Sequence, residues 1–349
     1  MKFSKITYLL IGLSTVMVGC SSSQLSQVPQ TRENYNKAID TSENEQFLLN
    51  IVRMHDGRSP YFIGVDAITV QSSLKTKSEA RMFNVNGFPA QGVAGPFWSV
   101  GPTIEFTEAP TITYSPLQGS KFVWSMMKPL SVSRISMLRS SGWALPNLLK
   151  LCVNRVGELD NSNVSRHVVG DDSNENSEFN HFINEITELS ALDKVDGSMT
   201  SYNGEPAFLL TANDTATGAE VSKLLHLKGV YTTFILAKHL DTGAAAPENV
   251  INLQTRSFLG IMNYVSYGIH DKESDADSEY ASHAGQFYVL TSNSEPSNAT
   301  VKTNYNGKWY YVASNDTKSK ATLVLLKLIY SLQVGDVKTT LPVVTIPVR

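Results

Sequence analysis

In the first half of the chain, some segments space their apolar residues as helices do and others as strands do. The capping box Ser42-Glu43-Asn44-Glu45 predicts a helix that begins there and ends near Asp56-Gly57. Partly alternating segments follow, and helical spacing then returns. We therefore expect strands over residues 61–72, 103–106 and 111–114, and three short helices over residues 117–127, 131–140 and 145–158.

The second half of the chain mixes the two spacings in the same way. Two Tyr-Asn-Gly turns, at residues 202–204 and 305–307, predict hairpins. Apolar spacing predicts helices over 179–189 and 256–269. Two more helices are expected to begin at capping residues, one at a second capping box over 217–220 and one at Asp316 or Thr317. Further strands are expected over 230–237, 286–291 and 341–348. Because this order lacks βαβ regularity, it predicts an α+β fold with antiparallel sheets.

The N-terminus has the pattern of an exported protein. Lys2 and Lys5 precede an apolar run over residues 6–18. Its length suits a secretory signal peptide and falls short of the ~18 apolar residues expected of a membrane-spanning helix. Residues 1–19 are therefore predicted to be a cleaved signal peptide.

The end of that segment, Met17-Val18-Gly19-Cys20, resembles a bacterial lipobox. The resemblance implies cleavage before Cys20, a diacylglycerol group on its thiol and palmitate on its new amine. The alternative is an ordinary signal peptide with a cysteine there by chance. Ser21 follows the cysteine, a pattern that in enteric bacteria implies export to the outer membrane, on its periplasmic or its cell-surface face.

Composition divides the remaining chain into two parts. After a polar tether over residues 20–33, residues 34–160 are expected to form an N-terminal α+β domain and residues 178–349 a C-terminal one. The segment 161–177 between them is dense in Asn, Asp and Ser, as linkers are. Residues 31–160 carry 13 Lys and Arg against 11 Asp and Glu, whereas residues 161–349 carry 14 against 21.

Overall composition excludes some classes of protein. The chain has 349 residues, of which 42% are hydrophobic and 17% charged, so it can bury a real core. Its formal charge of −3 gives no indication of nucleic-acid binding, which needs a clustered positive field. Cys152 lies on an apolar helical stripe with Leu148, Leu149 and Val156, which predicts a buried thiol and no nucleophile.

Several motifs together resemble a family of uncharacterised proteobacterial envelope lipoproteins over nearly the whole mature chain. They are Asn34-Tyr35-Asn36, Pro110-Thr111-Ile112-Thr113-Tyr114-Ser115-Pro116-Leu117, Ser141-Gly142-Trp143 and Arg256-Ser257-Phe258-Leu259-Gly260. The resemblance implies a lipid-anchored protein. It implies no activity, substrate or catalytic residue.

One segment is a candidate contact surface. Residues 83–102 combine four glycines with Phe88, Phe97 and Trp98. Aromatic side chains favour interfaces and membrane surfaces, and glycines allow close backbone approach. We expect either contact of Phe88, Phe97 and Trp98 with a partner or a lipid, or a hairpin loop that folds back on its own core.

Other candidates are weak, and no common catalytic motif occurs. Residues 270–283 are acidic but lack the Gly and the Glu of a calcium loop, so we expect a solvated loop and no metal or cofactor. His55 is expected to cap a helix C-terminus. Trp309-Tyr310-Tyr311 suits either packing within a strand or a platform on which a sugar ring stacks. Glu105 and Glu108 are three residues apart on an expected strand, so their side chains should point to opposite faces and are a weak candidate for a catalytic pair.

These features favour a lipid-anchored envelope protein that acts as a scaffold or interaction module, with an envelope protein as its partner and no catalysis evident. The alternative is a lipid- or glycan-binding lipoprotein. An envelope-polymer hydrolase is the third possibility and the least supported of the three.

Overall fold

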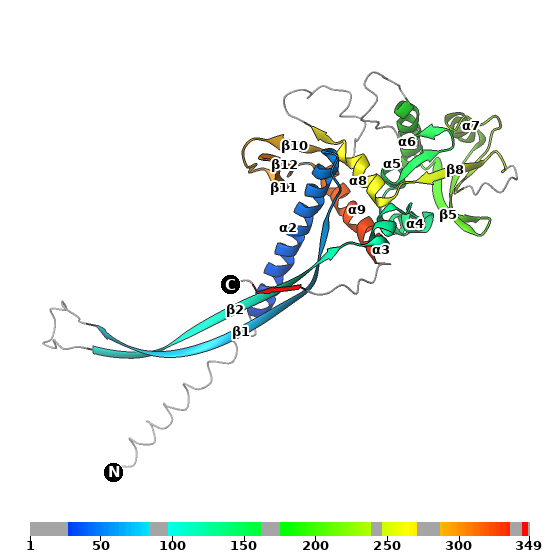
Figure 1. The fold of residues 1–349 in the computed structure, drawn as a ribbon. Coiled ribbons are helices and arrows are strands. Elements are labelled where there is room, and N and C mark those ends of the chain that lie inside the picture. The colour runs from blue at the N-terminus through cyan, green and yellow to red at the C-terminus, as the bar shows by residue number, and fades with distance from the viewer. Residues whose placement is uncertain are drawn as a thin grey trace, which may run out of the picture. The chain divides into compact units, whose positions relative to one another are not determined.

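The computed structural model describes residues 27–83, 97–161, 175–238, 246–270, 287–335 and 344–347 (Figure 1). Helices occur together with mainly antiparallel sheets, which confirms the predicted α+β class. Contacts between Cα atoms divide the chain into two compact units, Met1–Pro60 with Val123–Val337 and Tyr61–Phe122 with Lys338–Arg349. Within the described part, no helix is both long and apolar enough to cross a bilayer.

The smaller unit is built on a long antiparallel hairpin. β1 (Phe62–Phe83) pairs with β2 (Phe97–Leu117) over nearly its whole length, with one irregularity between Val65 and Ala67. The short strand β13 (Val344–Pro347) adds to the other edge of β2. A strand is thus present within the segment 341–348, where the sequence predicted a closing strand.

β2 is longer than the sequence predicted. The runs expected over 103–106 and 111–114 are parts of this one strand, which continues through Pro102 and Pro110. Proline cannot donate a ladder hydrogen bond and is tolerated on strands that have an open side. At Pro102 and Pro110, β2 pairs with a described strand on one side only, because β13 covers residues 111–114.

The larger unit contains a six-stranded sheet with the order β4-β3-β8-β7-β6-β5, in which only β7 and β8 are parallel neighbours. Its strands are β3 (Val153–Val156), β4 (Leu159–Asp160), β5 (Val195–Tyr202), β6 (Glu205–Ala212), β7 (Thr233–Ala237) and β8 (Val250–Thr255). β3 precedes the segment 161–177 and β8 follows it. One sheet therefore joins residues from both sides of that segment.

A second sheet in the same unit has the order β11-β12-β10-β9. Its strands are β9 (Ile269–His270), β10 (Val289–Ser292), β11 (Ala299–Tyr305) and β12 (Lys308–Ala313). The helices are α2 (Gln27–His55), α3 (Ser120–Met127), α4 (Val132–Ser140), α5 (Leu145–Cys152), α6 (Glu175–Ala191), α7 (Thr215–Leu224), α8 (Phe258–Ser266) and α9 (Thr317–Val334).

Both predicted Tyr-Asn-Gly hairpins are present. Asn203 and Gly204 join β5 to β6 with φ angles of 52° and 80°, and Asn306 and Gly307 join β11 to β12 with 53° and 83°. Two successive residues with positive φ define the tight turn that matches strand twist, and Asn-Gly is the sequence that adopts it most readily. These hairpins were predictable because the turn chemistry is local.

Several predicted helix ends are wrong. α2 begins at Gln27, so it includes the Ser42 capping box and part of the expected tether. α7 is capped by Asp214, whose side chain accepts a hydrogen bond from the Thr217 amide, and not by a box starting at Thr217. α5 ends at Cys152, because the following residues pair with β8 as a strand.

Helices α2, α8 and α9 share an aromatic core. The Phe47 ring meets the rings of Phe258 and Tyr330 edge-on, with centroid distances of 6.4 and 5.2 Å. At the edge of this core the Lys327 ammonium lies 2.7 Å from a carboxylate oxygen of Asp40. Phe47 and Phe258 are almost fully buried, so this contact fixes α2 onto the rest of the larger unit.

Arg256 is the central polar contact of the larger unit. It is only 3% exposed, and its guanidinium donates hydrogen bonds to the carbonyl oxygens of Lys150, Leu151 and Asn161. Its Cζ lies 4.0 Å from the centroid of the Tyr264 ring. Burial lowers the pKa of Arg256 to about 10, so the side chain remains a cation at neutral pH. The last carbonyls of α5 thereby find their donors in a residue far along the chain.

We expect Arg256→Met to lower the free energy of unfolding by about 3 kcal/mol, because it leaves buried carbonyl groups without donors. Urea denaturation followed by circular dichroism measures this loss. The matched control is Arg155→Met, since Arg155 is 44% exposed and pairs with Asp160 at 2.5 Å. A surface pair contributes at most about 1 kcal/mol, so equal losses in the two variants would contradict the role of Arg256.

Candidate functional site

Two of the four site residues singled out from the sequence lie outside the described structure. Cys20 and Phe88 are outside the described residues. Phe97 and Trp98 begin β2, where their backbones pair with Phe83 and Met82. Contact of these aromatic residues with a partner or a lipid therefore stays a prediction, and so does acylation of Cys20.

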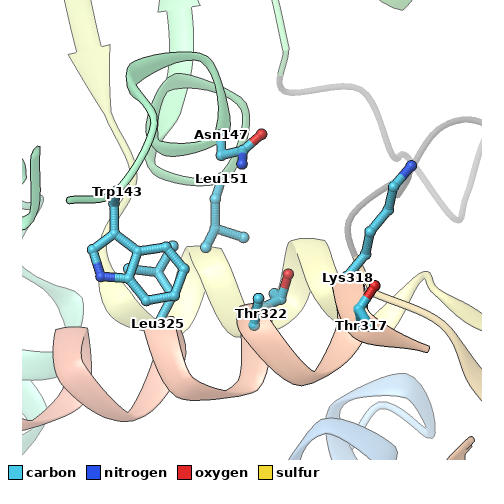
Figure 2. A pocket seen from close by; sticks show the side chains of 8 residues that line it. Trp143, Asn147, Leu151, Thr317, Lys318, Thr322 and Leu325 are labelled. Carbon is cyan, nitrogen blue, oxygen red and sulfur yellow. The ribbon is translucent and has the colours of Figure 1, made fainter. Parts of the chain in front are cut away.

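A small pocket lies between α5 and α9 of the larger unit. Its volume is about 180 Å³, and Figure 2 shows the side chains that surround it. The lining residues come from the loop before α5, from α5 and from α9: Trp143, Asn147, Leu151, Thr317, Lys318, Ala321, Thr322 and Leu325.

Helical periodicity explains how these residues come together. Thr317, Ala321 and Leu325 are spaced by four along α9, and Asn147 and Leu151 have the same spacing on α5. The start of α9 is fixed as predicted, because Asp316 accepts a hydrogen bond of 3.0 Å from the Ser319 amide.

The two ends of the pocket differ in chemistry. In Figure 2 the Trp143 ring lies beside Leu325 at one end, while the Lys318 side chain extends from α9 at the other. Near that polar end lies Lys150, whose pKa is lowered, first by burial and second by the positive charge of Lys318. The pocket is thus apolar on one side and positively charged on the other.

The volume of this pocket limits what it can hold. Pockets that enclose drug-sized ligands usually measure about 300–1,000 Å³, and we take about 300 Å³ as the least that would favour a lipid- or glycan-binding protein. The pocket reaches about 180 Å³, so it does not meet that condition. Its one lining cation, Lys318, suits the end of a small anion or of an acidic side chain.

The described histidines and carboxylates do not form a metal-binding group. Across the described residues, no group of three His, Cys, Asp or Glu side chains is placed to hold a metal ion. The acidic residues 271–286 lie outside the described structure. His226 lies 3.7 Å from Glu158 and 3.9 Å from Glu178, a grouping that sequence spacing does not reveal because it joins three separate elements.

Three minor sequence predictions can be compared with the structure. His55 is the last residue of α2, as expected, and its Nδ1 donates to the carbonyl oxygen of Ser266, the last residue of α8. Tyr311 is buried and Trp309 half-buried, with the Lys302 ammonium 5.9 Å from the Trp309 ring centroid. Cys152 is fully buried, as predicted.

Comparison with other proteins gives no family assignment. No protein-family model matches the chain, and no curated protein or solved structure matches it significantly. The resemblance to envelope lipoproteins therefore rests on the sequence motifs alone.

Replacing Lys318 should raise the pKa of Lys150. Lys318→Gln removes the nearby positive charge and leaves burial as the cause that lowers the pKa of Lys150. We expect the Lys150 pKa to move upward toward its ordinary value, as measured by NMR titration of lysine side chains. Lys223→Gln, an exposed change on α7, is the control and should leave the Lys150 titration unchanged.

Cys152 should be unreactive in the folded protein. Burial raises the pKa of its thiol to about 12, so almost no thiolate exists at pH 8 and reagents cannot reach it. In a chain carrying Cys20→Ser, we expect iodoacetamide to label Cys152 only after denaturation, as measured by mass spectrometry. Rapid labelling of the native protein would show that α5 opens readily.

Proposed function

We propose that this chain is a bacterial envelope lipoprotein, anchored in the outer membrane through acylated Cys20, that acts as a scaffold or interaction module for another envelope protein. The observation that carries the proposal is the sequence Met17-Val18-Gly19-Cys20 at the end of a signal-like apolar run. A single acyl chain binds a membrane weakly, whereas two or more give stable attachment. The modification implied at Cys20 supplies that stable attachment.

The start of α2 supports an anchor that acts close to the folded protein. Only residues 21–26 separate Cys20 from Gln27, where α2 begins. A chain of that length spans at most roughly 25 Å. An acylated Cys20 would therefore keep the first turn of α2 within about that distance of the bilayer surface, so the anchor would limit how far the larger unit can move from the membrane.

An interaction role agrees better with the side chains than a ligand-binding role does. The pocket between α5 and α9 is smaller than ligand pockets usually are. Large apolar side chains are instead exposed on the surface, among them Trp124 at 76% and Met127 at 58%. Lipid or glycan binding through Phe88, Phe97 and Trp98 remains the alternative proposal.

Replacing Cys20 tests the anchor and the partner together. In crosslinked cells, Cys20→Ser should move the protein out of the outer-membrane fraction and remove the partner that co-purifies with the wild-type protein. Mass spectrometry of the purified proteins should find an acylated N-terminus at Cys20 in the wild type only.

Cys152→Ser is the matched control, because Cys152 is buried and stands far along the sequence from the signal segment. This variant should keep both the acylation and the partner. A wild-type protein without acyl groups would disprove the anchor, and an acylated protein that yields no reproducible partner would disprove the interaction role.

A further inference from the structure

The charges of the chain are distributed very unevenly. Between Glu108 and Glu158 there is no Asp or Glu, and the six cations of this stretch give it a formal charge of +6: Lys121, Lys128, Arg134, Arg139, Lys150 and Arg155. The whole chain has a formal charge of −3, so the rest of it carries −9. Such a segregation produces a local positive field on an acidic protein.

Within that stretch, α3 presents apolar side chains to solvent. Trp124 is 76% exposed and Met127 is 58% exposed, and both lie on the side of the helix away from the buried pair Phe122 and Met126. Lys128 follows directly and is exposed as well. Tryptophan that is not buried in a folded domain is found mainly at interfaces with proteins or membranes.

The next helix, α4, buries Val132, Ile135 and Leu138. Its exposed Met137 and Arg139 are two positions apart and so point to different sides of that helix, which leaves α3 as the element with one continuous exposed apolar face. Lys128 makes no side-chain ion pair with any described residue. Within the described part of the chain, no carboxylate neutralises its charge, so it can meet an external anion.

We propose that the exposed face of α3 with the lysine that follows it, which we call the α3–α4 surface (Val123, Trp124, Met127 and Lys128), binds an anionic lipid bilayer. Exposed Trp and Met beside Lys and Arg are the composition of helices that lie in the membrane interface. Anionic headgroups attract Lys128, and the stretch of sequence around it carries no carboxylate that would repel them.

This binding does not require acylation of Cys20, so it can be tested separately from the proposed anchor. The probe is co-flotation of residues 20–349 carrying Cys20→Ser, a chain that contains every described residue. Vesicles of phosphatidylcholine alone are compared with an equal mixture of phosphatidylcholine and phosphatidylglycerol. We expect binding to the mixed vesicles only, and we expect added salt to weaken it.

Substitutions separate the contribution of the apolar side chains to vesicle binding from that of the charged side chains. Trp124→Ser with Met127→Ser should reduce binding roughly tenfold, because both side chains lose their contact with the acyl boundary. Lys128→Gln should reduce binding about fivefold, since one cation near an anionic surface contributes about that factor.

Matched controls lie elsewhere in the same unit. Leu192→Ser with Val230→Ser removes apolar side chains that are 65% and 58% exposed, and Lys194→Gln removes an exposed cation. These variants should bind as the unchanged chain does, and thermal unfolding followed by circular dichroism checks that all variants are folded. No preference for the anionic vesicles, or equal losses in the controls, would overturn the proposal.

A photocrosslinking residue in place of Trp124 distinguishes lipid from protein in cells. We expect adducts with phospholipid. A discrete protein adduct without lipid adducts would show that an acidic protein occupies the α3–α4 surface, and the lipid proposal would then be wrong.

Discussion

Burial of the Arg256 guanidinium determines how the larger unit is assembled. A cation that is 3% exposed has lost its hydration, and here the carbonyl oxygens of Lys150, Leu151 and Asn161 replace the water. Arg256 itself lies between β8 and α8, far along the chain from these carbonyls. The charge is therefore satisfied only when segments on both sides of residues 161–177 are folded against each other. A division of the chain at that point would leave both the cation and the end of α5 without partners.

Elements that depend on local backbone preferences could be predicted from the sequence, whereas elements that depend on distant partners could not. The two Asn-Gly hairpins depend on local backbone preferences and could be found from three residues each. By contrast, residues 153–156 continue the apolar spacing of α5 but form β3, because β8 pairs with them from about a hundred residues away. The start of α2 was missed for another reason. Ser42 and Glu45 form a capping box in sequence, yet nothing before Ser42 except Pro29 opposes a helix, and proline is tolerated in a first turn.

The candidate sites also differ in whether their residues are contiguous in the sequence or are brought together only by the fold. The lipobox-like sequence ending at Cys20 is a contiguous signal, so it can be found without a structure. The absence of acidic residues between Glu108 and Glu158 is also visible in the sequence, but it becomes meaningful only with the exposure of Trp124 on α3. The pocket between α5 and α9 joins residues more than 150 positions apart. No spacing rule predicts such a pair of helices, because their approach depends on the packing of the whole unit.

An acyl anchor and the α3–α4 surface would act on the same bilayer in different ways. Acyl chains fix the distance between the protein and the membrane but leave the protein free to rotate about the tether. Once the anchor holds the protein, binding by the surface becomes an intramolecular step with a high effective concentration, so even a weak surface contact is occupied most of the time. That contact would hold the exposed face of α3 against the headgroups and would thereby limit the rotation that the acyl chains alone leave free.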